Sequence, residues 1–328
     1  MNKFFKIALV GGGQLGSRYL QGIVALNLNL DIFVVDPSQV SHDICKSRIR
    51  EVKNNFDFEK YYQLSSIDGL PKKIDLVIIS TQADIRFFLL KSLLSAGHDI
   101  NFMILEKVLF QNIDEYDHSL KLINDNNIKC WVNCTRRTLP IYKKIKSQYS
   151  KHLVDSVTKI ELNGGEWGLM SNSIHFLDII SFITGSKKIV ITILDKLLPP
   201  SESISKRKGI YESSGELQGS CGNTSLKFLS AKDSNESHIL KIVTDFINIE
   251  IDEVNKKVIY TKNNISYEED FIFPNLSEIA GTIIERILLE GACDLTDIET
   301  SVALHKPFIN KVNTYFCDNF DESICPLT

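Results

Sequence analysis

The glycine-rich stretch Val10-Gly11-Gly12-Gly13-Gln14-Leu15-Gly16 decides the fold of this chain, and it directly follows the apolar run Phe5–Val10. Glycines 11, 13 and 16 form the pattern Gly-x-Gly-x-x-Gly. In that pattern the first glycine allows a tight turn, the second lets the backbone approach a pyrophosphate, and the third lets helix and strand pack closely. Helical periodicity over Gln14–Leu26 predicts a helix after the turn, whose free N–H groups, those of Gln14 and Leu15 included, hold the phosphates of a dinucleotide.

A second apolar run, Asp31–Asp36, ends in an acid at the spacing that a dinucleotide site requires. Asp36 lies 20 residues beyond Gly16, where a carboxylate binds the hydroxyls of the adenosine ribose. A carboxylate there repels a 2′-phosphate, and no arginine directly follows it, so the sequence predicts NAD as the cofactor rather than NADP. The alternative is a glycine-rich turn without a ligand, in which Asp36 caps Pro37-Ser38.

The first half of the chain alternates short apolar runs with helical patterns. Further strands are expected at Ile74–Thr81, Asn101–Leu105 and Lys129–Cys134, and the helices between them at Asp84–Ala96 and Asp114–Asn124. Continuous apolar strands separated by helices of this length are typical of a parallel, doubly wound sheet. We therefore expect an NAD-binding Rossmann domain over residues 1–135.

After about residue 150 the rhythm changes, with a strand expected at Ser156–Leu162 and then the almost wholly apolar helix Asn172–Thr184. Strand-like runs then follow one another without helices, at Ile189–Leu194, Gly215–Ser220, Leu226–Leu229, Ile239–Val243, Phe246–Ile251 and Asn255–Tyr260. The Ser-rich segment Leu197–Gly215 has no periodicity and predicts a loop near a site or an interface. Two closing helices, at about Leu276–Leu289 and Asp297–Phe316, can pack back on the first domain. Residues 136–328 thus predict a substrate-binding α+β domain with a large, mainly antiparallel sheet.

Size and composition exclude several classes of protein. A chain of 328 residues suits two domains better than one core. Its 37 basic and 41 acidic residues give a net charge of −4, so we expect no nucleic-acid partner. No apolar run reaches the roughly 18 residues of a membrane helix, and seven scattered cysteines without a Cys-x-x-Cys pair favour reduced cytoplasmic thiols over disulfides or a metal site.

Several motifs beyond the glycine-rich turn resemble those of the Gfo/Idh/MocA family of oxidoreductases. These are Thr81-Gln82-Ala83, Glu106-Lys107, Asn133, Arg136-Arg137 with Pro140, and the stretch from Gly164-Gly165 through His175-Phe176-Leu177-Asp178 to Thr184-Gly185. The resemblance implies that Thr81 and Glu106 border the cofactor and that Lys107 lies beside the nicotinamide and the reacting hydroxyl. It also implies that Asn133 lies at the domain junction and that His175 is the catalytic histidine of the substrate domain.

Two positions depart from the pattern of this family. Val108 follows Lys107 where a proline is usual, so we expect the lysine-bearing turn to lack that rigid support. Ser171 stands four residues before His175, where an acid is usual. A serine holds no charge at neutral pH, so the resemblance implies fold and cofactor more strongly than catalysis.

The chemistry expected of these residues is the oxidation of a secondary alcohol. Lys107 suits the reacting oxygen, and a lysine in a closed cleft can have its pKa lowered enough to share a proton. Ser171, His175 and Asp178 share one helical face, so we expect His175 to act as general acid/base with Asp178 as the only carboxylate left to orient it. The alternatives are a surface lysine at 107 and a core histidine at 175 bonded to Asp178.

Three further residues are weaker candidates for substrate contacts. Arg136 and Arg137 could grip a phosphate or carboxylate of the substrate, or form an interdomain salt bridge. Trp167 could stack on a sugar face, or belong to the core.

The leading hypothesis is reversible hydride transfer between NAD and a hydroxyl or keto carbon of a sugar or sugar derivative. The resemblance extends to nucleotide sugars of surface-glycan pathways. Two alternatives are an NAD-containing glycosidase, which uses the hydride only transiently, and a non-enzymatic NAD- and sugar-binding sensor with a degenerate site at Ser171. The large sheet predicts a homo-oligomer joined through its free face.

Overall fold

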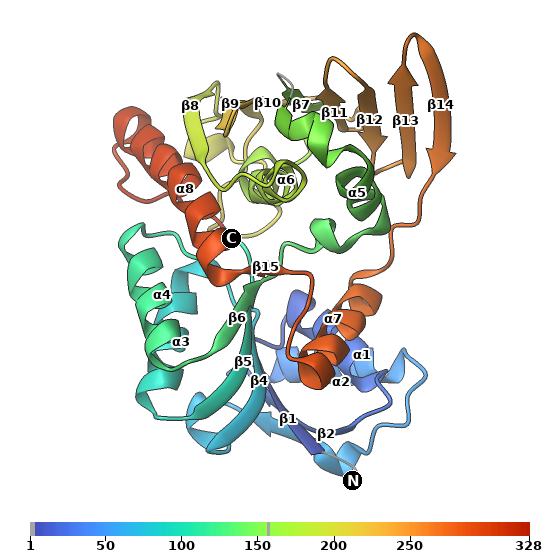
Figure 1. Ribbon diagram of the computed structural model, residues 1–328. Helices are drawn as coiled ribbons and strands as arrows, with labels where there is room; N and C mark the ends of the chain where they lie inside the picture. The colour runs from blue at the N-terminus through green and yellow to red at the C-terminus, as the bar shows by residue number, and fades with distance from the viewer. Residues whose placement is uncertain (1–3, 156–157) are drawn as a thin grey trace. The chain divides into compact units, whose positions relative to one another are not determined.

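The computed structural model describes residues 4–155 and 158–328, which form two compact units (Figure 1). The first unit contains the residues up to Phe110 together with Asp114–Asn133 and Pro274–Glu299. The second contains Gln111–Ile113, Cys134–Phe273 and Thr300–Thr328. Each unit is built on its own sheet, and the chain passes from one to the other several times.

The first unit has a seven-stranded sheet in the order β15-β6-β5-β4-β1-β2-β3. Its strands are β1 (Phe4–Val10), β2 (Asn29–Val35), β3 (Tyr61–Leu64), β4 (Lys73–Ile79), β5 (Asp99–Leu105), β6 (Lys129–Val132) and β15 (Thr296–Asp297). All neighbours pair in parallel except β15, which is antiparallel to β6. The order reverses between β1 and β4, which is the switch point where doubly wound sheets bind ligands. The predicted Rossmann sheet is confirmed.

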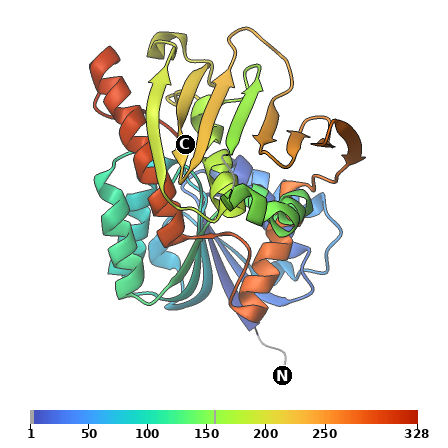
Figure 2. The ribbon, with the colours of Figure 1, turned by 45° about the horizontal axis from the view of Figure 1, so that its top comes forward.

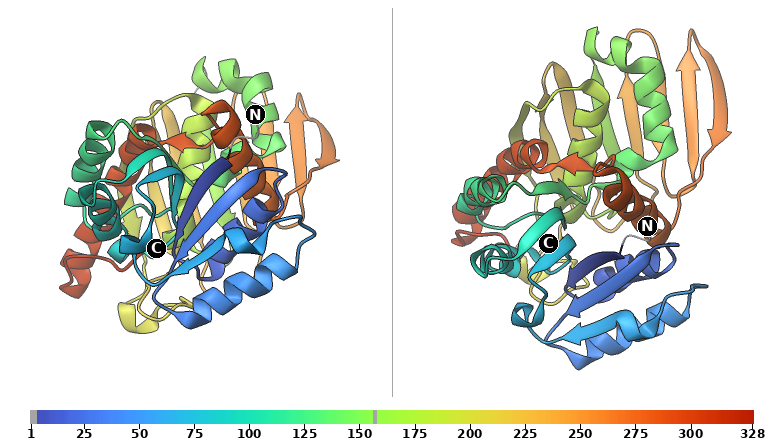
Figure 3. Two further views of the ribbon diagram at one scale, coloured as in Figure 1. Left: turned by 90° about the horizontal axis from the view of Figure 1, so that it is seen from below. Right: turned by 60° about the horizontal axis from the view of Figure 1, so that its bottom comes forward.

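Helices cover both faces of this sheet, as Figure 2 and Figure 3 show. They are α1 (Gln14–Val24), α2 (Gln39–Arg50), α3 (Ala83–Ser95), α4 (Asp114–Asp125) and α7 (Leu276–Glu290). Although α7 comes late in the chain, it packs against α1 in the first unit. The contact is close because two glycines meet there: a Cβ on Gly22 would lie 2.8 Å from the nitrogen of Gly281.

The second unit has an eight-stranded sheet in the order β14-β13-β12-β11-β7-β10-β9-β8. Its strands are β7 (Lys159–Gly164), β8 (Ile189–Asp195), β9 (Gly215–Cys221), β10 (Thr224–Ser230), β11 (Ile239–Val243), β12 (Asn248–Asp252), β13 (Lys257–Lys262) and β14 (Ile265–Asp270). All neighbours are antiparallel except β7 and β10. This confirms the large, mainly antiparallel sheet. The sequence patterns missed β14, whose residues are almost all exposed at the sheet edge.

Two helices and the long closing helix complete the second unit. They are α5 (Pro140–Asp155), α6 (Leu169–Thr184) and α8 (Ile298–Phe320), of which α6 contacts β9 and β10. Nearly every residue of α6 is buried, as its apolar composition predicts. The exceptions are Ser171, Asn172, His175 and Phe182, so two of the three candidate site residues on this helix keep some exposure, whereas Asp178 is buried.

Membrane helices, metal clusters and cysteines bear on the class of protein rather than on the candidate site. Within the described residues, no helix combines the length and the apolar character that crossing a bilayer takes. In the same part of the chain, no three His, Cys, Asp or Glu side chains gather where a metal ion could bind. All seven cysteines are free thiols, and five of them are buried.

Candidate functional site

The glycine-rich turn joins β1 to α1 and has the geometry of a phosphate cradle. Gly11 has a φ of +97°, and a Cβ there would lie 3.0 Å from the Thr81 Cγ2 atom. A Cβ on Gly16 would lie 1.9 Å from the carbonyl oxygen of Gly11, so no larger residue fits. Gly13 differs, because a Cβ there would meet no protein atom within 4 Å. Gly13 is also the N-cap of α1 and supplies no side-chain cap, so it leaves the first N–H groups of the helix available to an anion.

Asp36 follows β2 and is fixed in place by backbone donors. Its Oδ2 accepts a hydrogen bond from the nitrogen of Gly12 at 2.8 Å, and its Oδ1 accepts one from the nitrogen of Ser38 at 2.9 Å. Each carboxylate oxygen has a second lone pair. The side chain is therefore held beside the glycine-rich turn with acceptor capacity for the hydroxyls of a ribose.

Glu106 and Lys107 follow β5 at the same edge of the sheet, and their environments differ sharply. Glu106 is buried, and its Oε1 accepts hydrogen bonds from the Tyr19 hydroxyl at 2.5 Å and from Asn133 Nδ2 at 2.6 Å. Burial raises the pKa of Glu106, against the opposing effects of Tyr19, Arg86, Lys107 and Asn133. Lys107 is half-buried. Glu106 and Asn133, expected at the cofactor and the substrate, thus bond to each other inside the first unit.

The turn that carries Lys107 is held by Arg86, a residue that the sequence patterns did not single out. Arg86 Nη1 donates to the carbonyl oxygens of Glu106 and Leu109, at 2.8 Å each, and to that of Val108. Its Nη2 donates to the carbonyl oxygen of Thr81. Desolvation lowers the pKa of this buried guanidinium to about 10, so it stays charged at neutral pH. The turn has no proline at Val108, and Arg86 from α3 holds its backbone through these hydrogen bonds instead.

The second unit carries His175 on α6, a helix that two carboxylates contact at other positions. Asp178, one turn after it, is buried and forms an ion pair with Arg137 Nε at 3.5 Å. Arg137 also lies over the ring of Phe182, 4.8 Å from its centroid. Arg137 is therefore the ion-pair partner of Asp178 within the second unit.

The second carboxylate at α6 belongs to Glu212, from the segment between β8 and β9, and it lies at the first turn of the helix. Its Oε1 accepts hydrogen bonds from the nitrogens of Met170 at 2.8 Å and Ser213 at 3.0 Å. Its Oε2 accepts from the nitrogen of Ser171 at 3.0 Å and from the Ser171 hydroxyl at 2.5 Å. Asp178 is therefore not the only carboxylate that contacts this helix, and its expected role of orienting His175 stays a prediction. Leu197–Gly215 was predicted to be a loop near a site or an interface, but no pattern identified Glu212 within it.

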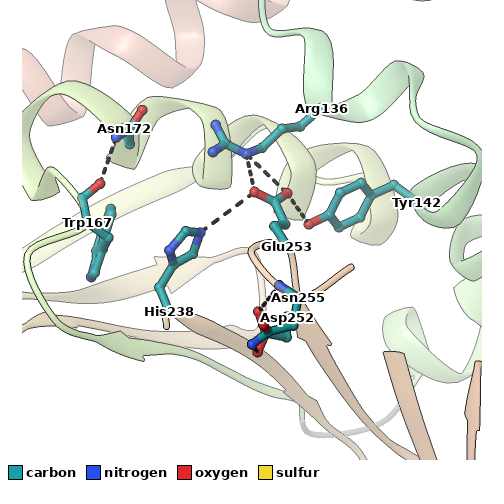
Figure 4. A network of polar contacts seen from close by, with 8 residues as sticks. All are labelled: Arg136, Tyr142, Trp167, Asn172, His238, Asp252, Glu253 and Asn255. Carbon is teal, nitrogen blue, oxygen red and sulfur yellow. Dashed lines mark hydrogen bonds and ion pairs between the residues drawn. The ribbon is translucent and has the colours of Figure 1, made fainter. Parts of the chain in front are cut away.

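Arg136 belongs to a polar network inside the second unit, shown in Figure 4. Arg136 Nε donates to Glu253 Oε2 at 2.8 Å and to Oε1 at 3.1 Å, and the Tyr142 hydroxyl donates to Oε1 at 2.7 Å. Burial acts to raise the pKa of Glu253, but Arg136, His238 and Tyr142 outweigh it and lower the pKa to about 2. Arg136 thus has a carboxylate partner within its own unit.

Trp167 lies in an aromatic cluster near this network. Its side chain is only 9% exposed, its Nε1 donates to the carbonyl oxygen of Leu229 at 2.9 Å, and its ring meets Phe176 and Phe228 edge to face. Of the two readings of Trp167, this geometry favours the core tryptophan.

Comparison with known proteins agrees with this architecture. A family model described as an oxidoreductase family with an NAD-binding Rossmann fold, Gfo/Idh/MocA, matches residues 5–134. No curated protein sequence matches the chain.

Three solved structures share the fold. Gal80p from Saccharomyces cerevisiae, a super-repressor mutant, is 15% identical with a TM-score of 0.73, covering 95% of each chain. UDP-N-acetylglucosamine 3-dehydrogenase from Acidithiobacillus ferrooxidans is 13% identical with a TM-score of 0.70, covering 94% of this chain and 97% of that one. Scyllo-inositol dehydrogenase from Lactobacillus casei, solved with NAD(H) and scyllo-inositol, is 17% identical with a TM-score of 0.66, covering 92% and 94%. Residues 5–134 therefore match the model of an oxidoreductase family with an NAD-binding Rossmann fold, and the chain as a whole has the fold of these proteins.

Proposed function

We propose that the chain is an NAD-dependent oxidoreductase that transfers a hydride to or from a hydroxyl-bearing carbon of a sugar or sugar derivative. The observation that carries this proposal is the uncapped start of α1 at Gly13, with Asp36 fixed beside it. Thr81 and Lys107 follow β4 and β5, and the carboxyl ends of parallel strands share one edge of the sheet. That edge therefore offers the phosphate cradle, the ribose acceptor and the lysine together.

The backbone of the turn and Asp36 bind and orient the cofactor in this proposal. The N–H groups of Gln14 and Leu15 hold the pyrophosphate, and Asp36 binds the adenosine ribose and disfavours a 2′-phosphate. The nicotinamide, when bound, supplies the hydride acceptor or donor. NAD is thus favoured over NADP because a carboxylate stands where the extra phosphate would lie.

Lys107 and His175 divide the work on the substrate. As the carbinol carbon loses its hydride, Lys107 Nζ donates a hydrogen bond to the oxygen and stabilises the developing negative charge. His175 takes the hydroxyl proton while the C=O bond forms, and it returns that proton in the opposite direction. Both residues keep partial exposure, unlike Glu106 and Asp178, which are buried.

The class of substrate is inferred from the proteins that share the fold. One is a dehydrogenase of a nucleotide sugar and another a dehydrogenase of a cyclic polyol. Both compounds present secondary hydroxyls of the kind that this pair of residues would oxidise. We therefore propose a sugar, a sugar nucleotide or a polyol as the substrate.

Turnover on a panel of UDP-sugars and inositols tests the proposal, with reduced nicotinamide followed by its absorbance. We expect net cofactor reduction with at least one compound, and a loss of about 10²–10⁴-fold in Lys107→Ala and His175→Ala, the usual range for a proton-transfer group. Product formed without net reduction would indicate the NAD-containing glycosidase. A His175→Ala variant with a lower melting temperature and normal turnover would show that His175 belongs to the core and takes no part in catalysis.

A second candidate is a non-enzymatic regulator that binds NAD and a sugar. The likeness to Gal80p favours it, because a related structure from Kluyveromyces lactis is described as a transcriptional regulator. This candidate predicts that NAD binds normally while no compound of the panel is oxidised by the wild type, at any pH.

A further inference from the structure

The segment between β8 and β9 delivers a carboxylate to the first turn of the helix that carries His175. Glu212 accepts four hydrogen bonds there, three from backbone nitrogens and one from the Ser171 hydroxyl. Ser171 and Glu212 are 41 residues apart in the sequence, so helical periodicity cannot predict this contact. An anion at this position is stabilised by the helix N-terminus as well as by its donors.

The backbone around Glu212 is held in place, so the direction of its side chain is built into the fold. The nitrogen of Glu212 donates to Ser203 Oγ at 3.0 Å, and its carbonyl oxygen accepts from the nitrogen of Ile204 at 3.0 Å. The nitrogen of Tyr211 donates to the carbonyl oxygen of Pro326 at 2.8 Å. An earlier part of the same loop and residue Pro326 thus anchor the backbone that carries this carboxylate.

The space around the contact fits only a glycine at position 168. Gly168 has a φ of +80°, and a Cβ there would lie 3.1 Å from Ser171 Oγ and 3.2 Å from Glu212 Oε2. A side chain would therefore press on the hydroxyl and the carboxylate at once. The close pairing of Ser171 with Glu212 depends on this glycine.

Glu212 differs from the other carboxylates at α6 and its neighbours in having no arginine partner. Charged groups at this helix include Asp178 with Arg137, Arg136 over the ring of Phe176 with its partner Glu253, and Lys146 over the ring of Phe182. Asp178 and Glu253 each pair with an arginine. Glu212 has no cationic partner within 4 Å in the part of the chain that the structure describes. A net negative charge therefore remains at the start of the helix, one turn before His175.

We infer that Glu212, acting through Ser171, is a positioning residue that stabilises the protonated form of His175. This inference rests on the proposed function, in which His175 exchanges the substrate proton. Ser171 and His175 are one turn apart, where side chains lie about 5–6 Å from each other. A hydroxyl that donates its hydrogen to a carboxylate presents only lone pairs to other neighbours, and lone pairs favour an imidazolium N–H. The negative charge of Glu212 acts in the same direction.

Titration of the His175 imidazole by NMR tests the inference in the full chain without cofactor. The signal is assigned by its loss in His175→Gln. Glu212→Gln removes the charge, and we expect the pKa of His175 to fall by about one unit, because the imidazolium loses a neighbouring anion. An unchanged pKa would overturn the inference and leave Glu212 as a helix cap.

Glu278 provides a matched control, since it is the glutamate of the capping box at the start of α7 and lies in the other unit. Glu278→Gln makes the same substitution at a helix N-terminus, so it should cost similar capping stability and leave the pKa of His175 unchanged. An equal fall in both variants would show a general effect of net charge and overturn the inference.

Ser171→Ala keeps the carboxylate and removes the hydroxyl. We expect a smaller fall of the pKa of His175 in the same direction. Should Glu212→Gln fail to fold, this variant decides the matter: a fall supports the inference and an unchanged value overturns it.

The pH dependence of kcat/KM adds a readout of function. The acidic limb in Glu212→Gln should move to lower pH by the same amount as the imidazole pKa, because the neutral base is then available at lower pH. If no sugar is oxidised by any variant, the proposed function fails, whereas the NMR titration still decides the role of Glu212. A limb that stays in place while the imidazole pKa falls would overturn the role of Glu212 in catalysis.

Discussion

The turn that carries Lys107 and the helix start that precedes His175 are each held by a charged side chain that binds backbone groups, but the two charges are opposite. In the first unit a cation, Arg86, binds backbone carbonyl oxygens around Lys107. In the second unit an anion, Glu212, binds backbone N–H groups one turn before His175. In both regions a charged side chain from another segment of the chain binds the backbone beside a candidate catalytic residue.

The two regions differ in burial, and this difference determines what each charge controls. Arg86 is only 1% exposed and all its described hydrogen bonds go to carbonyl oxygens, so it sets the geometry of the turn. Glu212 is half-buried and touches a side chain of the candidate site, so its charge acts on the protonation of a neighbour. A fully buried charge is thus expected to affect stability most, and a half-buried one to affect pH dependence most.

Arg86→Ala should have the largest effect. It leaves the carbonyl oxygens of Thr81, Glu106, Val108 and Leu109 without their donor, and we expect a loss of about 3–5 kcal/mol in the free energy of unfolding, the usual cost of breaking a buried charged group's network. Turnover should fall with it, because the backbone on both sides of Lys107 is released. Denaturant unfolding of Arg86→Ala and Arg86→Lys measures the effect, with partial recovery expected in the lysine variant. A loss below about 1 kcal/mol, within the range of an ordinary hydrogen bond, would contradict the conclusion that Arg86 holds the turn in place.

Ser171→Asp should have an intermediate effect, and it tests the other region. Taken without Glu212, a carboxylate at 171 would simply raise the pKa of His175. The structure adds Glu212 against this position, so two carboxylates meet, and we expect a loss of about 1–3 kcal/mol at neutral pH from unsatisfied acceptors.

The double variant Ser171→Asp with Glu212→Gln should recover that loss, since the amide can donate to the new carboxylate. A double-mutant cycle on unfolding free energies measures the coupling, expected at about 0.5–3 kcal/mol. Strictly additive effects would mean that residues 171 and 212 do not meet.

Glu106→Gln should have the smallest effect, visible as a change of pH dependence. Burial raises the pKa of Glu106 in the folded chain above its unfolded value. The wild type should therefore lose stability as pH rises from the unfolded pKa to the folded one, because ionisation costs more in the folded state. Glutamine can still accept the bonds of Tyr19 and Asn133, so its stability should lack this slope. Unfolding curves from pH 4 to 9 compare the two, and parallel slopes would count against a raised pKa.

Most of the fold could be predicted from local patterns, because each signal lay within a few residues. The turn Gly11–Gly16, the strand ending at Asp36 and the parallel sheet are of this kind. The closing helix α7 was predicted as a helix, and its glycine contact with α1 could be seen only in three dimensions. The edge strand β14 was missed because its exposed residues show no alternation.

The candidate site was predicted only in part, for the same physical reason. Lys107 and His175 belong to continuous motifs, whereas the partners of these segments come from distant positions. Arg86 left one signal, a charged residue on the apolar face that Leu90 and Leu93 share on α3. Glu212 left none, since it lies in a loop without periodicity and the hydrogen bonds that place it are long-range.

Calorimetric titration of NAD into the wild type and Gly13→Ala tests most directly whether the glycine-rich turn binds a dinucleotide. Gly13 has a φ of −66°, which alanine adopts readily, and its Cβ would meet no protein atom within 4 Å. Folding should therefore be largely unchanged, whereas Gly16→Ala, whose Cβ would lie 1.9 Å from the carbonyl oxygen of Gly11, should fold poorly. We predict that the methyl group of Gly13→Ala occupies the space of the pyrophosphate and weakens NAD binding by at least about tenfold, or about 1.4 kcal/mol. A folded Gly13→Ala variant that binds NAD as tightly as the wild type would contradict this account.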